Sequence, residues 1–212
     1  KNAADGLARP EPGVKGQVIV VGYGRFGQMV AQMLYAVDQP ITLIDKKPSQ
    51  IELSSQFDVK VYYGDGQRVD VLRHAGAESA AAIVFCTDDR TLGAAALEEI
   101  RRAFPQAKLF ARAFDRRQMM EFHPARLDGS IRELYESAIA MGGMVLDAIG
   151  VDHDEIVDAE QAVRHLDTAR LAMQIDSGDI AAGRDLRFTP GGGQRPREIL
   201  DQLADRLRRD GR

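Results

Sequence analysis

The sequence VVGYGRFGQMV, residues 20–30, places three glycines within six residues, directly after an apolar run and directly before a helix-like pattern. Gly22, Gly24 and Gly27 form a G-x-G-x-x-G motif. In such a motif the first glycine permits a tight turn, the second lets a phosphate approach the backbone, and the third lets the helix pack closely on the strand. The stretch therefore predicts a strand, a phosphate-binding turn and a helix N-terminus that attracts an anion. The candidate site includes the other residues of the turn, Tyr23, Arg25 and Phe26.

An acidic residue about 20 positions further on is the second requirement of a dinucleotide-binding motif, because it accepts hydrogen bonds from the ribose hydroxyls. Asp45 meets this requirement at the end of a predicted strand, 41–45. Its carboxylate should repel a 2′-phosphate, which favours AMP or NAD(H) over NADP(H). Lys46 and Lys47 follow directly, and a cation beside Asp45 can neutralise such a phosphate; the alternative for both lysines is solvated surface.

Apolar runs and helical periodicity alternate along the first half of the chain. Regular alternation of this kind predicts parallel βαβ units, and so an α/β fold with a Rossmann-like doubly wound parallel sheet. The predicted strands are 17–22, 41–45, 59–65, 81–86 and 108–113, and the main predicted helices are 25–37, 48–57 and 89–104.

The segments GDG (64–66) and CTDD (86–89) follow two of the predicted strands. Ligands of open α/β sheets bind at the carboxyl ends of the strands. This position makes Asp65, Gly66 and Thr87 candidate pocket residues. Asp88 is a further candidate, although a helix cap explains it equally well. Cys86 reads as a buried strand residue rather than a redox sensor.

The apolar positions from 131 to 149 predict one long helix with a single apolar stripe, interrupted by Gly142 and Gly143. Close packing on its own sheet or on a second subunit would explain glycines in a helix interior. Residues 151–212 predict a helical and irregular C-terminal extension.

Composition excludes several classes of function. With 28 basic and 32 acidic residues, the net charge of −4 offers no broad basic surface for nucleic acid. The single cysteine, Cys86, excludes an intrachain disulfide. Residues 1–16 contain two prolines and three glycines and read as a linker cut from a longer protein.

Signs of catalysis are missing from the sequence. None of the four histidines has a clear acidic partner, no metal-ligand spacing is present, and Tyr135 is not followed by the lysine of a Tyr-x-x-x-Lys pair. The pattern favours binding without chemistry. Two alternatives stay open: a small NAD-dependent oxidoreductase, and an oligomerisation module whose pocket no longer binds a ligand.

The segments VIVVGYGRFGQMVAQML, ITLIDKKPSQIE, VKVYYGDGQRVDVLRHAGAESAAAIV, CTDD and LFARAFD, in this order and spacing, resemble the nucleotide-binding RCK domain, also called KTN or TrkA-N. The resemblance covers roughly residues 16–150, which we therefore take as an RCK domain at 17–150. It is most similar to the C-terminal domain of Kef-type, glutathione-gated potassium efflux antiporters.

The resemblance implies a cytosolic regulatory domain of an inner-membrane antiporter, without enzymatic activity, which forms a homodimer and binds AMP or NAD(H). It implies that the helix 131–149 joins the two subunits and that a membrane module precedes the linker. Arg25 and Arg112 match basic positions of the motif. Phe114 stands where Kef proteins tend to have an arginine, which weakens the expectation of a glutathione site near the dimer interface.

Overall fold

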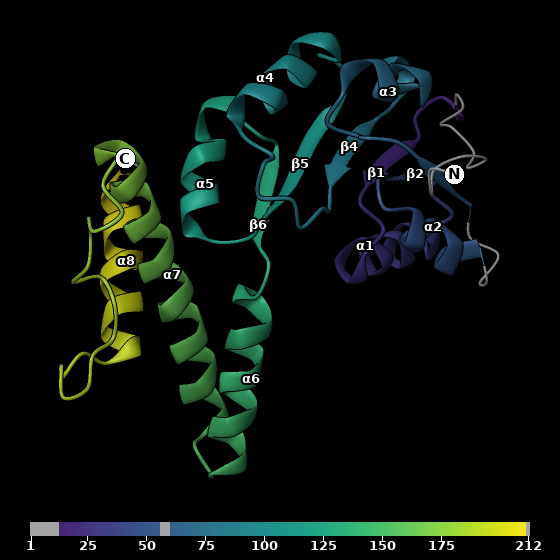
Figure 1. Ribbon diagram of the computed structural model, residues 1–212. Helices are drawn as coiled ribbons and strands as arrows, with labels where there is room; N and C mark the ends of the chain where they lie inside the picture. The colour runs from purple at the N-terminus through teal and green to yellow at the C-terminus, as the bar shows by residue number, and fades with distance from the viewer. Residues whose placement is uncertain (1–12, 56–59, 211–212) are drawn as a thin grey trace. The chain divides into compact units, whose positions relative to one another are not determined.

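The computed structural model describes residues 13–55 and 60–210, and within them it contains a six-stranded parallel sheet (Figure 1). The strand order is β3-β2-β1-β4-β5-β6. This order reverses between β1 and β4, which confirms the predicted doubly wound Rossmann-like fold. The strands are β1 (Val18–Val21), β2 (Ile41–Asp45), β3 (Val61–Tyr63), β4 (Ala82–Phe85), β5 (Lys108–Ala113) and β6 (Gly129–Arg132).

Helices cover both faces of the sheet, with α1 and α2 on one side and α3, α4 and α5 on the other (Figure 1). Side chains alternate across a strand, so Val18 and Val20 of β1 enter one core cluster while Ile19 and Val21 enter the other. These elements are α1 (Arg25–Tyr35), α2 (Pro48–Ser55), α3 (Val69–His74), α4 (Ala94–Ala103) and α5 (Arg116–Phe122), with the short 3-10 helices η1 (Ala77–Ser79) and η2 (His123–Ala125).

The predicted strands 41–45 and 108–113 match β2 and β5 at both ends, and the other predicted strands are slightly longer than the observed ones. Residues 56–59, where one predicted helix ends and a predicted strand begins, lie outside the described residues. The sequence analysis also missed α5, a helix capped by the Asp115 carboxylate, which accepts a hydrogen bond from the Gln118 amide at 2.9 Å.

The prediction of one helix from 131 to 149 was wrong at its beginning. Residues Gly129–Arg132 form the edge strand β6, in which Ile131 pairs with Arg112 of β5. The helix itself, α6, spans Tyr135–Ala148. Ile131 was counted in a helical apolar stripe, but backbone pairing with β5 determines its conformation instead.

A second compact unit begins at Leu134 and contains α6, α7 (His153–Ser177) and α8 (Pro196–Asp210). Within it α7 packs against both α6 and α8. Gly143 of α6 is buried against α7, because a Cβ there would lie 2.6 Å from the Glu160 carboxylate. The assignment of residues 17–150, including α6, to one RCK domain stays a prediction.

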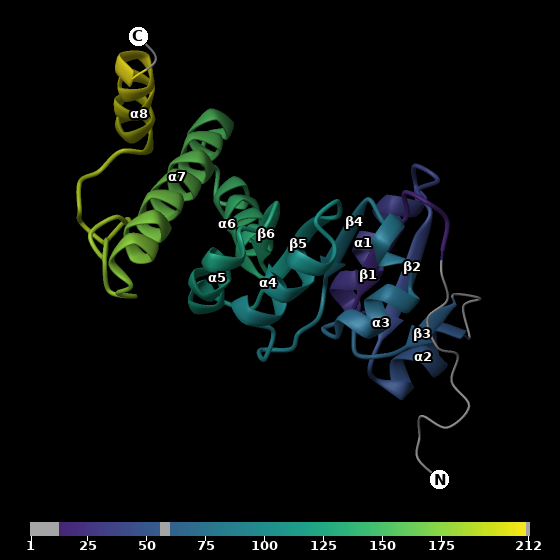
Figure 2. The same cartoon turned by 90° about the horizontal axis from the view of Figure 1, so that it is seen from above.

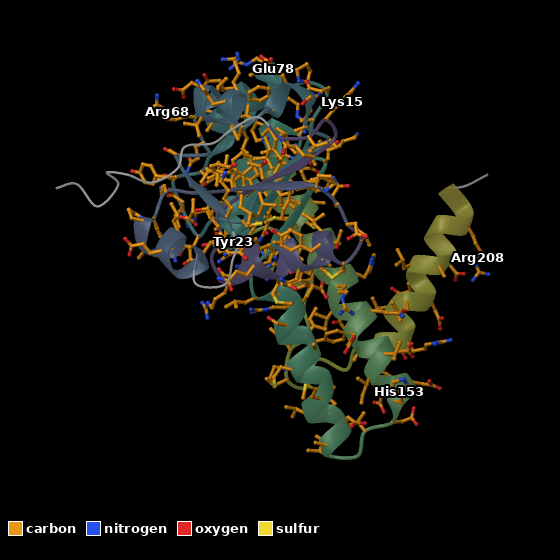
Figure 3. The ribbon with its side chains drawn as sticks, turned by 90° about the vertical axis from the view of Figure 1, so that its right-hand side faces the viewer. Lys15, Tyr23, Arg68, Glu78, His153 and Arg208 are labelled. Carbon is orange, nitrogen blue, oxygen red and sulfur yellow. The ribbon has the colours of Figure 1, made fainter. Side chains whose placement is uncertain are left out.

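Side chains gather densely around the sheet, where Tyr23 lies (Figure 3). In the helical unit, α6 exposes Met141, Met144 and Val145, and Ile149 directly after the helix is exposed as well. No helix among the described residues is long and apolar enough to cross a membrane.

Candidate functional site

The three glycines of the motif lie in different surroundings. Gly22 has a φ of +93°, and a Cβ there would lie 2.8 Å from the Thr87 amide nitrogen. A Cβ at Gly27 would collide with the carbonyl oxygen of Gly22, so the third glycine lets α1 approach β1. At Gly24 a Cβ would meet nothing within 4 Å. The turn is therefore closed where the helix packs and open at the middle glycine.

The open glycine is also the N-cap of α1. Gly24 provides no side-chain cap, and no acidic residue occupies the first helical turn, which begins with the exposed Arg25. The first N–H groups of a helix have no partner within it and attract an anion. Because no described carboxylate of α1 competes for them, this helix N-terminus suits a phosphate.

Asp45 lies beside the turn, at the end of β2, and is only 7% exposed. Its Oδ2 accepts a hydrogen bond from the Tyr23 amide at 2.8 Å, and its Oδ1 accepts one from the Lys47 amide at 2.7 Å. Two backbone donors thus fix the carboxylate. Each oxygen has a second lone pair, which leaves it able to accept a hydrogen bond from a ribose hydroxyl.

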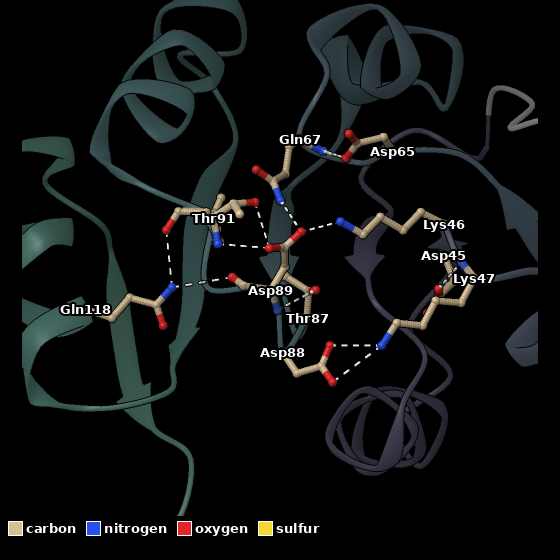
Figure 4. A network of polar contacts seen from close by, with 11 residues as sticks. Asp45, Lys46, Lys47, Asp65, Gln67, Thr87, Asp88, Asp89, Thr91 and Gln118 are labelled. Carbon is tan, nitrogen blue, oxygen red and sulfur yellow. Dashed lines mark hydrogen bonds and ion pairs between the residues drawn. The ribbon is translucent and has the colours of Figure 1, made fainter.

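The two lysines after Asp45 reach across the carboxyl edge of the sheet to the loop after β4 (Figure 4). Lys46 Nζ forms an ion pair with Asp89, and Lys47 Nζ lies 3.1 Å from Asp88 Oδ1. The hydrogen bond from Lys46 lowers the pKa of Asp89, and the same bond raises the pKa of Lys46. Lys47 likewise lowers the pKa of Asp88. Neither lysine is only solvated surface.

Asp89 is the centre of a polar network (Figure 4). Its Oδ1 accepts hydrogen bonds from the Thr91 amide at 2.8 Å and the Thr91 hydroxyl at 2.6 Å. Its Oδ2 accepts a hydrogen bond from the side-chain Nε2 of Gln67 at 3.2 Å. The alternative that Asp88 caps the following helix was wrong, because the N-cap of α4 is Gly93. The position of CTDD directly after a strand was the signal available in the sequence.

The remaining candidates at this edge have local partners. Asp65 Oδ1 accepts a hydrogen bond from the backbone N–H of Gln67 at 3.1 Å, and the Thr87 hydroxyl oxygen accepts one from the backbone N–H of Asp89 at 3.1 Å. Gly66 is buried, and a Cβ there would collide with the side chain of Val21. The structure therefore brings Asp65 and Thr87 to the same edge as Asp45 and gives Gly66 a packing role.

Arg112 lies in β5 and is 8% exposed. Its Nη1 donates to the Cys86 carbonyl at 3.2 Å, its Nη2 pairs with Glu133 at 2.5 Å, and its guanidinium lies 5.2 Å from the centre of the Phe26 ring. Arg112 thus connects the glycine turn, the end of β4 and the residue after β6. Sequence reasoning found Arg112 but not Glu133.

Cys86 is buried, and this burial raises the pKa of its thiol to about 12. A thiol with such a pKa is rarely deprotonated and reacts slowly with oxidants. This supports the interpretation of Cys86 as a buried residue rather than a redox sensor, although it lies directly after β4 and not within the strand.

Phe114, the departure from the Kef motif, has a cation against its ring. The guanidinium carbon of Arg90 lies 3.6 Å from the ring centre. A hollow surrounds this pair, and its lining carries charges of both signs. The lining residues are Arg90, Phe114, Asp115, Arg117, Gln118 and Glu121.

Among the described residues, no group of three or more histidine, cysteine, aspartate or glutamate side chains could hold a metal ion. The parallel sheet, the open glycine turn and the oriented acid at the end of β2 define a Rossmann-type domain. The TrkA-N domain family model matches residues 18–132, and the chain belongs to this family.

Relatives of the chain include glutathione-regulated potassium-efflux system proteins. It is 34% identical over 161 residues to a glutathione-regulated potassium-efflux system protein of Haemophilus influenzae, covering 76% of this chain and 26% of that relative. The chain thus spans about a quarter of that relative's length.

Solved structures with the same fold include the C-terminal domain of Kef from Shewanella denitrificans in its AMP-bound form. That structure has a TM-score of 0.68 and 33% identity, covering 76% of this chain and 99% of the other. The GsuK channel bound to NAD has a TM-score of 0.57 at 22% identity, covering 68% of this chain and 25% of the other, and shows the fold alone.

Proposed function

We propose that this chain is the cytosolic regulatory domain of a Kef-type potassium/proton antiporter of the inner membrane, and that it binds an adenine nucleotide, AMP or NAD(H), at the Gly22 turn. The observation that carries the proposal is the combination at one sheet edge of an open Gly24, a helix N-terminus without an acidic cap, and a carboxylate at Asp45 held by two backbone amides. A phosphate fits the first two features and a ribose fits the third.

The relatives support the transporter part of the proposal. The chain covers 26% of the Haemophilus influenzae protein, so a membrane module of the same polypeptide would supply the transport. The Kef C-terminal domain, of which 99% matches this chain, was solved with AMP bound. The contributions of Arg25, Asp65, Thr87 and the other candidate residues to binding stay predictions.

Gating would act through a homodimer. The exposed apolar face of α6 is a contact surface for a second subunit, since apolar side chains such as Met144, 66% exposed, gain free energy when another surface covers them. A nucleotide shifts the equilibrium between two dimer arrangements only by its difference in affinity for them. Binding at the sheet edge would therefore change transport by favouring one arrangement.

Glutathione is a second ligand of this proposal, at the hollow beside Phe114. Arg90 supplies a cation against the ring of Phe114, close to the place where Kef proteins tend to have an arginine. The lining carries Arg117, Asp115 and Glu121 as well, and charges of both signs suit a ligand that has carboxylates and an ammonium group.

The test is mass spectrometry of the nucleotide that copurifies, followed by titration of AMP, NADH and glutathione against melting temperature and subunit mass. A ligand at 100 times its Kd stabilises the folded state by about 2.7 kcal/mol, roughly 5 to 10 °C for a chain of this size. No shift with AMP or NADH would contradict the nucleotide proposal. Hydride transfer from bound NADH to a carbonyl substrate would favour the oxidoreductase alternative.

Two variants locate the site. Gly24→Asp places a carboxylate where the phosphate would lie, in space that is otherwise open, so it should abolish the shift without unfolding the domain. Asp45→Ala should weaken binding by removing the ribose contact. Glu78→Gln is the control, because Glu78 lies in η1, before β4 and so at the opposite edge of the sheet. Equal shifts in all three variants would mean that the ligand binds elsewhere.

A further inference from the structure

The charges next to Asp45 are arranged in a way that the proposed function does not require. Two lysines follow the ribose-facing acid, yet both ammonium groups point to the loop after β4 and pair with aspartates there (Figure 4). The pairs join the ends of β2 and β4, which flank β1 and its glycine turn. They therefore cross the edge at which a nucleotide would bind.

We propose that Asp88 and Asp89 determine the nucleotide specificity of this site, by holding Lys46 and Lys47 away from the ribose so that neither lysine is free to pair with a 2′-phosphate. This inference rests on the proposed nucleotide site. In Rossmann domains an acid after the second strand accepts the ribose hydroxyls of NAD, whereas a nearby cation accommodates the 2′-phosphate of NADP. This chain has both an acid, Asp45, and cations beside it, Lys46 and Lys47. Because the aspartates pair with the lysines, the acid alone is left to contact the ribose.

The electrostatics favour rejection of the 2′-phosphate. Each lysine is matched by one aspartate, which leaves the Asp45 carboxylate as the uncompensated charge beside the ribose position. A 2′-phosphate would meet this carboxylate and would have to separate a lysine from its aspartate to gain a partner. AMP and NAD(H) carry an uncharged hydroxyl at that position, which donates a hydrogen bond to Asp45 and needs no such change.

The two aspartates contribute unequally. The Asp89 side chain is 12% exposed and is held by Thr91 and Gln67 as well as by Lys46. In the other pair the Lys47 and Asp88 side chains are 56% and 63% exposed, and exposed ion pairs are weak. Asp89 should therefore be the main determinant and Asp88 the minor one.

The test compares AMP with adenosine 2′,5′-bisphosphate, which differ only by the 2′-phosphate, in calorimetric titrations. The wild-type protein should prefer AMP by about tenfold or more. Asp89→Asn frees Lys46 but keeps an oxygen that accepts the Thr91 hydrogen bonds. It should narrow the preference by about tenfold, since one charge-assisted contact to phosphate has that order of effect. Asp88→Asn should narrow it less.

Two controls separate a freed lysine from a general change of charge. Asp89→Asn combined with Lys46→Gln should restore the wild-type preference, because no freed cation is left. Glu78→Gln removes one negative charge from an exposed pair with Arg73 and should leave the preference unchanged. Melting curves check that every variant is folded.

The outcomes distinguish the inference from the function on which it rests. A wild-type protein that binds neither AMP nor NAD⁺ overturns the proposed function. A protein that binds AMP but shows the same preference in wild type and folded Asp89→Asn overturns the inference alone. The inference is supported if Asp89→Asn narrows the preference for AMP over adenosine 2′,5′-bisphosphate and the double variant restores it.

Discussion

The sheet unit and the helical unit bury their side chains to very different extents. In the sheet unit β1 is buried on both faces and helices from both sides complete two core clusters. In the helical unit only Ile156 and Ala162 belong to the buried hydrophobic residues of the described chain, while α6 exposes three large apolar side chains. The difference indicates that the sheet unit is stable through its own core, whereas α6 is suited to be covered by another surface.

The largest expected difference between the units is in the effect of a glycine-to-alanine substitution on stability. Gly27→Ala should lower the free energy of unfolding by about 3 kcal/mol and weaken nucleotide binding, because the new methyl group collides with the Gly22 backbone. Gly142→Ala places the same methyl group in open space on α6 and should raise helix stability by about 1 kcal/mol. Urea unfolding of both variants measures the two effects. Equal effects would show that the turn is not closely packed.

A smaller difference is expected between two ion pairs. Glu133→Gln leaves the buried Arg112 without its anionic partner and should cost about 2 kcal/mol, since the Cys86 carbonyl still accepts one hydrogen bond. Glu136→Gln removes a pair with the more exposed Arg164 and should cost about 0.5 kcal/mol. Thermal unfolding of the two variants checks this. Equal losses would mean that the Arg112 pair is not buried in solution.

The smallest expected difference is in how stability depends on pH. The Asp128 carboxylate accepts a hydrogen bond from the Leu109 amide and pairs with Arg101 and Lys108, and these contacts lower its pKa to about 2. Because the folded pKa lies below the unfolded value, this stabilisation is complete above about pH 4 and is lost as the pH falls through 2. Asp128→Asn should cost about 1 kcal/mol at pH 6, and the difference from wild type should shrink towards pH 2.

Melting temperatures between pH 6 and pH 2 test this expectation. Asp147→Asn, an exposed residue of α6, is the matched control and should follow the wild-type curve. A constant difference between wild type and Asp128→Asn down to pH 2 would contradict the lowered pKa.

Local patterns made most of the sheet unit predictable. The run before Gly22 and the acid at Asp45 identified the first two strands and the turn, because a buried parallel strand is apolar on both faces and glycine spacing follows from close backbone approach. The same reasoning failed at Ile131, which is apolar in a helix stripe and in an edge strand alike. It also missed α5, whose N-cap is visible as Asp115 but whose helix is short.

The candidate site was predictable only along single segments. Asp45, Asp65 and Thr87 could be placed at one edge, because parallel strands end on the same side of a sheet. The partners of Lys46 and Lys47 could not, since the aspartates lie more than 40 residues further along the chain. For the same reason Glu133 gave no sign that it pairs with Arg112.

The sequence by itself determined the Rossmann-like fold, the glycine turn and the acid beside it, because each depends on spacing within about 25 residues. Only the tertiary structure decided that the lysines after Asp45 are held by Asp88 and Asp89, that Arg112 joins three segments, and that α6 packs on α7. The contacts of the lysines and of Arg112 depend on which strands become neighbours, and the sheet order β3-β2-β1-β4-β5-β6 brings these distant residues together. The packing of α6 on α7 depends instead on contacts within the helical unit. In the proposed site, the turn GYGRFG would therefore set the kind of ligand, and the aspartates across the sheet edge would select among such ligands.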